Sequence, residues 1–127
     1  MQDAFASAIQ TVGFTKHYQG VFPVKCNHDR RLLETVVNYG KPTHFGLEAG
    51  SKPELLLAAS LLQQAGSDGL LICNGYKDEA YIETVLLTSQ LNNACIMLVL
   101  EKLEELPLIL EVLTKPNPLV ASPTGKC

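Results

Sequence analysis

The feature that most restricts the fold of this chain is a repeat in which a short apolar run is followed by a longer segment with helical periodicity. Four such runs occur: VFPVK, THFGLE, GLLICN and ACIMLVL. Short runs that are apolar at nearly every position are typical of strands buried on both faces of a parallel sheet. If these strands end at Lys25, Leu47, Ile72 and Val99, the steps between the ends are 22, 25 and 27 residues. The sequence therefore predicts four consecutive β/α units.

The segments between the runs carry signals for the start and stop of helices. The first has Asn27 or Asp29 as its N-cap. The second, residues 51–64, opens with SKPE, a capping box with proline in the first turn. A third helix is predicted over about 78–91. The fourth contains Pro107, which a helix tolerates only in its first turn, where the missing N–H would have no partner anyway.

Two α/β folds are consistent with this order of elements. Right-handed crossovers join consecutive parallel strands, so four units form either a small doubly wound sheet or part of an eight-fold barrel. A complete barrel needs typically about 250 residues, and this chain of 127 residues can supply only half of one. In both folds the chemistry lies at the carboxyl ends of the strands, where Lys25, Glu48, Asn74 and Glu101 fall.

Charge and composition exclude several classes of function. A net charge of -3 offers no basic field for nucleic acid. No apolar run approaches the roughly 18 residues needed to span a bilayer, and MQDAFASAIQ lacks the basic start and apolar core of a signal peptide. The four cysteines form no CxxC pair, and the three histidines show no metal-ligand spacing. We therefore expect a cytoplasmic protein that binds neither nucleic acid nor membrane and has no metal-ligating residues.

The motifs resemble those of a known enzyme family. YQGVFPVKCN, FGLEAGSKPELLLA, ICNGYKDEAYIE and LVLEKLEEL look very like consecutive segments of biosynthetic arginine decarboxylase, a pyridoxal-phosphate enzyme of the alanine racemase-like barrel group. Related ornithine and diaminopimelate decarboxylases share the lysine-asparagine strand end and a shorter form of the SKxE turn. The resemblance covers residues 2 to about 114. It implies that residues 1–114 are the first half of a (β/α)8 TIM-type barrel that binds pyridoxal phosphate, followed by a divergent irregular tail, 115–127.

The resemblance also implies a reaction and a set of site residues. Biosynthetic arginine decarboxylase converts arginine to agmatine and carbon dioxide in the biosynthesis of polyamines such as putrescine and spermidine. Lys25 matches the lysine that holds the cofactor as an imine, and Glu48 matches an acidic position near that lysine and the cofactor. The same resemblance implies arginine as the small-molecule partner, allows magnesium as a second cofactor, and implies a homo-oligomer.

Each of these residues also has a simpler interpretation. A lone lysine at a strand end is usually a solvated charge, although apolar surroundings at a barrel rim would help its amine to lose a proton and attack an aldehyde. Glu48 is also consistent with a charged residue in a βα loop, and the capping box accounts for Glu54. Asn74 and Lys77 either serve the barrel mouth or belong to a turn closed by Asn74-Gly75.

The chain departs from the resemblance at both ends, where it is expected to be truncated. The tail KPNPLVASPTGKC has no strand pattern where a fifth strand would follow. Half a barrel exposes two strand edges and one sheet face, which favours self-association. Two hypotheses follow: the chain is part of an arginine decarboxylase with Lys25 as its Schiff-base residue, or it is a non-catalytic product that binds a full-length decarboxylase subunit.

Overall fold

A computed structural model describes residues 2–16, 18–91 and 94–115 of the chain. Its elements, in chain order, are α1 (Gln2–Val12), β1 (Val21–Pro23), the 3-10 turn η1 (Val24–Cys26), α2 (Arg30–Gly40), the 3-10 turn η2 (Lys41–Thr43), β2 (Gly46–Ala49), α3 (Lys52–Gln64), β3 (Leu71–Cys73), α4 (Glu79–Leu91), β4 (Ile96–Leu98) and α5 (Glu105–Thr114). The predicted tail, 115–127, lies outside the described residues except for Lys115, so its division from the barrel domain stays a prediction.

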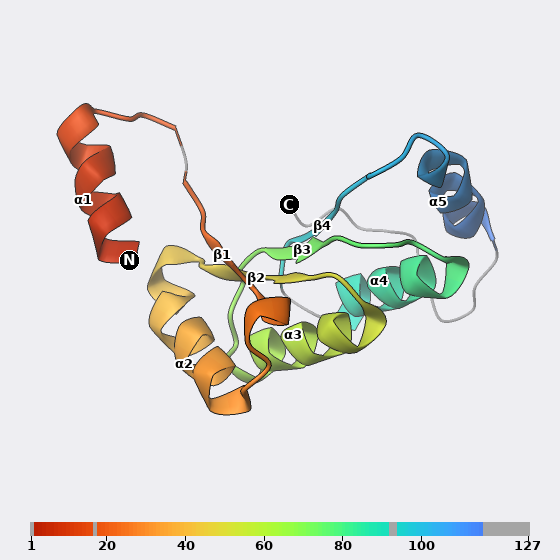
Figure 1. The fold of residues 1–127 in the computed structure, drawn as a ribbon, viewed down its shortest axis with the longest axis horizontal. Coiled ribbons are helices and arrows are strands. Elements are labelled where there is room, and N and C mark those ends of the chain that lie inside the picture. Colours follow the sequence, from red (N-terminus) through yellow and green to blue (C-terminus); the bar gives the residue numbers. More distant parts are fainter. Residues whose placement is uncertain (1, 17, 92–93, 116–127) are drawn as a thin grey trace.

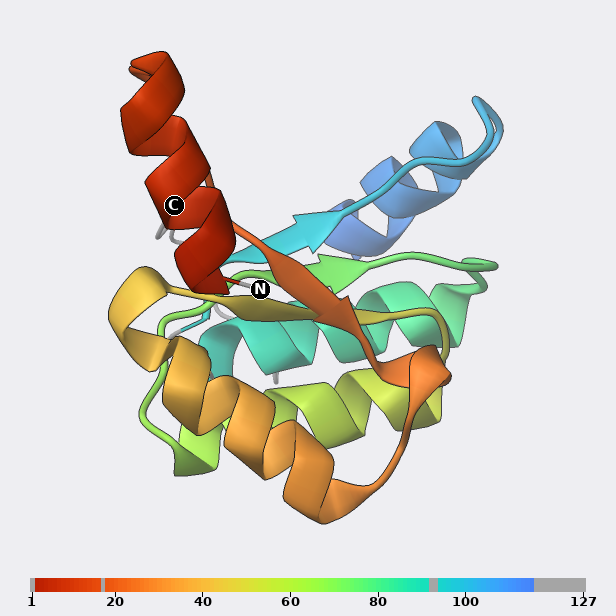
Figure 2. The ribbon, with the colours of Figure 1, turned by 60° about the vertical axis from the view of Figure 1, so that its left-hand side comes forward.

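The order of the strands distinguishes between the two folds that the periodicity allowed. All neighbouring strands are parallel, and their order in the sheet, β1-β2-β3-β4, is their order along the chain. A doubly wound sheet reverses its strand order and carries helices on both faces. Here α2, α3 and α4 lie together on one face of the sheet (Figures 1 and 2), and α5 contacts α4. The arrangement is that of the first part of a β/α barrel, as predicted.

The register separates the strand residues into two faces. Leu47 of β2 and Leu71 of β3 are paired neighbours and fully buried in a core shared with α2, α3 and α4. Because successive side chains along a strand point to opposite faces, Glu48 and its pair Ile72 lie on the face away from these helices. The same row continues to Met97 of β4, whose exposed fraction is 51%. This open face is the one that becomes the interior in a closed barrel.

The helix boundaries confirm the local signals in the sequence. The Asp29 carboxylate accepts a hydrogen bond from the Leu32 N–H (3.0 Å) and caps α2. Ser51 is the N-cap of α3, and its hydroxyl accepts from the Glu54 N–H at 3.5 Å. Pro107 is the third residue of α5, within the first turn. These three helix starts need only short-range contacts, which explains why the sequence predicts them.

The strand ends differ from the prediction by one or two residues, and one helix was not predicted. β2, β3 and β4 end at Ala49, Cys73 and Leu98. β1 ends at Pro23 rather than Lys25, because the chain turns at once into η1, which closes with the Asn27 N–H donating to the Val24 carbonyl at 3.1 Å. Lys25 therefore lies in the turn after the strand. The helix α1 was not predicted, and Figure 1 shows it apart from the layer of α2, α3 and α4. None of the helices in the described part of the chain combines the length and apolar character needed to cross a membrane.

Candidate active site at the carboxyl ends of the strands

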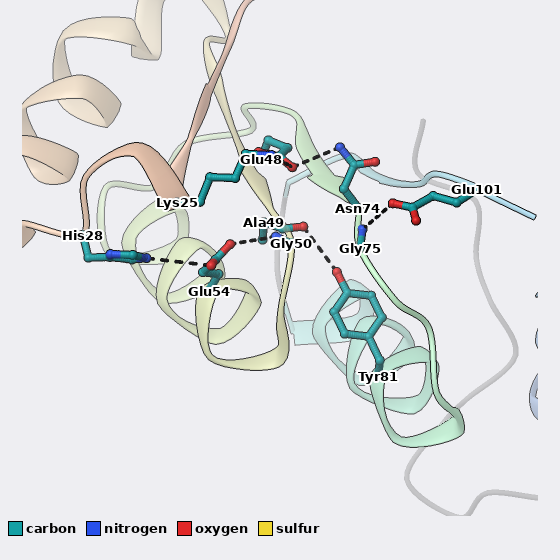
Figure 3. A network of polar contacts seen from close by, with 10 residues as sticks. All are labelled: Lys25, His28, Glu48, Ala49, Gly50, Glu54, Asn74, Gly75, Tyr81 and Glu101. Carbon is teal, nitrogen blue, oxygen red and sulfur yellow. Dashed lines mark hydrogen bonds and ion pairs between the residues drawn. The ribbon is translucent and has the colours of Figure 1, made fainter.

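The structure brings together the two residues that were predicted as site residues. Lys25 follows β1, and Glu48 is the third residue of β2. Because Pro23 and Glu48 are paired in the parallel register, the turn after β1 lies beside the end of β2. Lys25 Nζ lies 3.7 Å from Glu48 Oε1, and the exposed fractions of the two side chains are 63% and 8%. Figure 3 shows both side chains at the same end of the sheet.

The carboxylate of Glu48 is buried, and only one of its two oxygens accepts a hydrogen bond from the described residues. Its Oε1 accepts a hydrogen bond from Asn74 Nδ2 at 3.0 Å. Its Oε2 is buried and has no hydrogen-bond partner among the described residues. Buried polar atoms are seldom left without a partner because the loss of hydration is not recovered. Glu48 therefore has an acceptor left for a donor that is not part of the described chain.

Asn74 lies at the end of a strand, beside a glycine with positive φ, and its side chain also reaches a predicted site residue. It follows β3, and its backbone N–H donates to the Ala49 carbonyl at 2.8 Å, which carries the β2–β3 pairing one residue further. The next residue, Gly75, has φ of +83° and makes the turn. The Asn74 side chain at the same time reaches Glu48. The asparagine-glycine pair in the sequence was the signal for this contact, but the pair alone did not identify Glu48 as the acceptor.

Glu54 stabilises the loop between β2 and α3. Its Oε2 accepts from the Gly50 N–H at 2.8 Å, one residue before the capping Ser51. Its Oε1 lies 3.8 Å from Nε2 of His28, which the sequence indicated only as an ordinary polar residue. The Ser51 half of the predicted capping box is confirmed, whereas the Glu54 carboxylate accepts from the N–H of Gly50, the residue before the cap. In addition, the contact with His28 ties the loop after β1 to the loop after β2 (Figure 3).

Tyr81 connects α4 to the end of β2. Its hydroxyl donates to the Ala49 carbonyl at 3.4 Å, and its exposed fraction is 1%. Burial, followed by the neighbouring Cys73, raises the pKa of Tyr81 well above its ordinary value. The phenol therefore stays protonated and acts as a hydrogen-bond donor. This contact holds the α4 side of the site against β2.

Within the described part of the chain, Lys25 is not enclosed by apolar side chains. The sequence allowed apolar surroundings at a barrel rim as an alternative to a solvated charge. The side chain is instead mostly exposed, because the sheet face around it is open. The described residues alone therefore do not desolvate Lys25, and its contact within the site is the carboxylate of Glu48.

Comparison with known proteins identifies the family. Residues 2–122 match the family model described as the pyridoxal-dependent decarboxylase, pyridoxal binding domain. The chain belongs to this family. A protein named arginine decarboxylase from Glycine max is 53% identical over 115 residues, which cover 91% of this chain and 16% of that protein. Biosynthetic arginine decarboxylase from Synechococcus sp. RCC307 is 52% identical over 111 residues, which cover 87% of this chain and 17% of that protein.

A solved structure supports the same relationship. The crystal structure of biosynthetic arginine decarboxylase from Campylobacter jejuni superposes with a TM-score of 0.76 at 31% sequence identity, over 85% of this chain and 18% of that one. The chain thus spans about a sixth of the length of the curated relatives that it matches. The resemblance inferred from the motifs is confirmed at the level of family and fold.

The side chains at the strand ends of this chain fit the cofactor after which its family is named. An exposed primary amine, that of Lys25, is available to an aldehyde, and the Glu48 oxygen without a partner can accept a hydrogen bond from a bound group. Asn74 and Glu54 hold the surrounding loops through their own hydrogen bonds. Within the part of the chain that the structure describes, no cluster of three or more His, Cys, Asp or Glu residues could hold a metal ion.

Proposed function

We propose that this chain is a segment of a pyridoxal-phosphate-dependent arginine decarboxylase in which Lys25 carries the cofactor. The observation that carries the proposal is the amine of Lys25 beside the buried carboxylate of Glu48, at the carboxyl ends of the strands in a member of this family. When bound, pyridoxal phosphate supplies an aldehyde that condenses with an amine with loss of water, and a ring that takes up the electron pair left when carbon dioxide departs.

The residues of the chain have separate roles in this proposal. Lys25 reacts only as a neutral amine, so its ammonium must first lose a proton to solvent. Glu48 Oε1, at 3.7 Å from Lys25 Nζ, holds the lysine at the strand ends as an ion pair until then. Asn74 fixes the carboxylate while this happens, since its amide donates to the same oxygen.

Arginine as the substrate rests on the names of the relatives, all of which span far more sequence than this chain. The products would then be agmatine and carbon dioxide, at the start of polyamine biosynthesis. Magnesium, a homo-oligomeric state and the absence of nucleic-acid or membrane partners stay predictions. The predicted compartment is the cytoplasm. One relative from Nicotiana tabacum is named as chloroplastic, so a plastid is the alternative, and cell fractionation would distinguish the two.

Covalent capture of the cofactor tests the proposal. The chain is incubated with pyridoxal phosphate, reduced with borohydride and digested, and the labelled peptides are identified by mass spectrometry. We expect the label on the peptide with Lys25 and its loss in K25A. Lys52, which is 43% exposed and paired with Asp78, is an internal control. Equal labelling of both lysines, or labelling that persists at the same level in K25A, would contradict the proposal.

The second hypothesis, binding to a full-length decarboxylase subunit, is favoured by one observation. The sheet face that carries Met97 is open, and β1 and β4 each have one neighbouring strand among the described residues. A partner that supplied further strands would cover these edges. Co-purification with a full-length arginine decarboxylase subunit, together with no adduct at Lys25, would support this hypothesis over cofactor capture.

A further inference from the structure

A lysine outside the proposed cofactor site is completely buried. Lys77, in the loop between β3 and α4, has a side chain with 0% exposure. Its Nζ donates to the Gly75 carbonyl at 2.6 Å and lies 3.5 Å from Oε2 of Glu105. A buried ammonium is costly unless it is paired and hydrogen-bonded. Lys77 meets this condition through a contact with the backbone of the residue that follows Asn74.

Glu105, the partner of Lys77, connects this lysine to the loop after β4. Glu105, the first residue of α5, also accepts a hydrogen bond from the Glu101 N–H at 2.8 Å. That bond, with the nearby Lys77 ammonium, holds the pKa of Glu105 below its ordinary value, so the carboxylate stays charged. The Glu101 carboxylate in turn accepts from the Gly75 N–H at 3.0 Å. Lys77 therefore holds the Gly75 carbonyl and Glu101 holds its N–H, while Glu105 contacts both of these residues.

The contacts on Gly75 fix the position of the preceding residue, Asn74. Gly75 has φ of +83°, and a Cβ added there would lie 2.2 Å from the Gly50 carbonyl oxygen, so its backbone is pressed against the loop after β2. Asn74 is fixed on one side by its own N–H bond to Ala49 and on the other by the held Gly75. From this backbone the Asn74 side chain reaches Glu48 Oε1 (Figure 3).

We propose that Lys77 is a positioning residue for the cofactor lysine: by holding the Gly75 carbonyl it keeps the Asn74 amide on Glu48, and so sets how strongly Glu48 holds Lys25. The effect on cofactor binding rests on the proposed role of Lys25. The contacts from Lys77 through Gly75 and Asn74 to Glu48 do not depend on that role. The Asn74 amide and the Lys25 ammonium share the same oxygen of Glu48. When the amide is withdrawn, that oxygen interacts with the ammonium alone, and Lys25 reacts more slowly as a nucleophile.

The test uses the chain without cofactor and two readouts. The first is the side-chain amide signal of Asn74 in a ¹H–¹⁵N NMR spectrum, identified by its loss in N74A. The second is the rate at which an acylating reagent modifies Lys25, followed by peptide mass spectrometry. We expect K77M to move the Asn74 signal and to slow modification of Lys25 about twofold, the size expected for an exposed ion pair. N74A should slow it equally, and K77M/N74A no further.

A matched control and a second variant keep the test decisive. K52M removes another lysine, at the start of α3, whose 2.7 Å contact is with Asp78 and not with Gly75, so the Asn74 signal should stay in place. E101A removes the exposed carboxylate that holds the Gly75 N–H and should move the Asn74 signal even if K77M does not fold. An unchanged Asn74 signal in both K77M and E101A, or additive effects in K77M/N74A, would overturn the inference.

The two proposals fail separately. If pyridoxal phosphate does not label Lys25 but K77M moves the Asn74 signal, the proposed function is wrong and the positioning of Asn74 by Lys77 holds. If pyridoxal phosphate labels Lys25 but neither K77M nor E101A affects Asn74, the proposed function holds, and the buried lysine only ties two loops together.

Discussion

Lys25 Nζ lies 3.7 Å from Oε1 of Glu48, although the two residues are separated by an entire β/α unit in the sequence. The parallel pairing of β1 with β2 creates this contact because it sets Pro23 opposite Glu48 and leaves the following turn at the end of the sheet. The carboxylate is buried on the open face, while the amine is exposed. An exposed amine next to a fixed charge can be reached by a ligand without movement of the sheet.

Replacing Glu48 by glutamine should make Lys25 more reactive. E48Q keeps an oxygen for the Asn74 amide but removes the negative charge that holds the Lys25 side chain in an ion pair. Because Lys25 is mostly exposed and solvent screens the pair, we expect its acylation rate at neutral pH to rise only about twofold to fivefold. Peptide mass spectrometry measures the rate, with Lys52 in the same sample as the control. A slower rate in E48Q would show that the charge activates the amine instead.

The cap of α3 should contribute measurably to stability. S51A removes the hydroxyl that accepts from the Glu54 N–H, and we expect the free energy of unfolding in urea to fall by about 1 kcal/mol. S60A, in the middle of the same helix, is the control, since the Ser60 hydroxyl only donates to the Leu57 carbonyl. Alanine is favoured at that position, so S60A should be close to neutral. Equal losses for both variants would refute the cap.

Gly75 should tolerate a side chain much less well than another glycine with positive φ. In G66A the cost is mainly backbone strain, about 1 kcal/mol, because the closest atom to a new Cβ is Lys41 Nζ at an ordinary 3.6 Å. In G75A the Cβ also overlaps the Gly50 carbonyl oxygen, and we expect a total loss of about 3 kcal/mol or more. Urea unfolding of both variants checks the difference. Similar losses would mean that the loops after β2 and β3 move apart freely.

The charge of Asp78 should stabilise the fold in a pH-dependent way. The Lys52 ammonium, followed by the Tyr81 N–H, holds the pKa of Asp78 below its ordinary value. A carboxyl group with a lowered pKa contributes stability above its unfolded pKa of about 4, and this is lost as the pH falls through the folded value. D78N should therefore be less stable than the wild type at pH 7, and the difference should shrink below about pH 4. If the stability difference between the wild type and D78N grew as the pH fell, the expected pH dependence would be wrong.

The two free cysteines of the described chain should differ strongly in reactivity. Burial raises the pKa of Cys73 to about 11, so the reactive thiolate is about one part in ten thousand at pH 7. Cys26 is exposed beside Lys25. Iodoacetamide should therefore modify Cys26 in the folded chain and Cys73 only after unfolding in urea. Modification of Cys73 at a rate comparable to that of Cys26 without urea would show that β3 opens readily.

The candidate site was predictable in part. The residue types at the strand ends and the family motifs pointed to Lys25 and Glu48, and Asn74 was recognised as either a site or a turn residue. Lys77 and Glu105 could not be recognised as buried partners. A lysine in a loop and a glutamate in the first turn of a helix are usually solvated, and their burial here arises only when the loop after β3 meets the start of α5.

The sequence by itself determined the elements that depend on neighbours along the chain. The caps at Asp29 and Ser51, the proline in the first turn of α5 and the four apolar runs act over a few residues, so their pattern could be read directly. The residue patterns left two folds open and the family motifs chose between them, but only the tertiary structure decided which polar atoms meet. The strand order and register arise from packing of whole helices on the sheet, and they set Glu48 opposite Pro23 and within reach of Asn74, at separations where sequence patterns carry no information about distance.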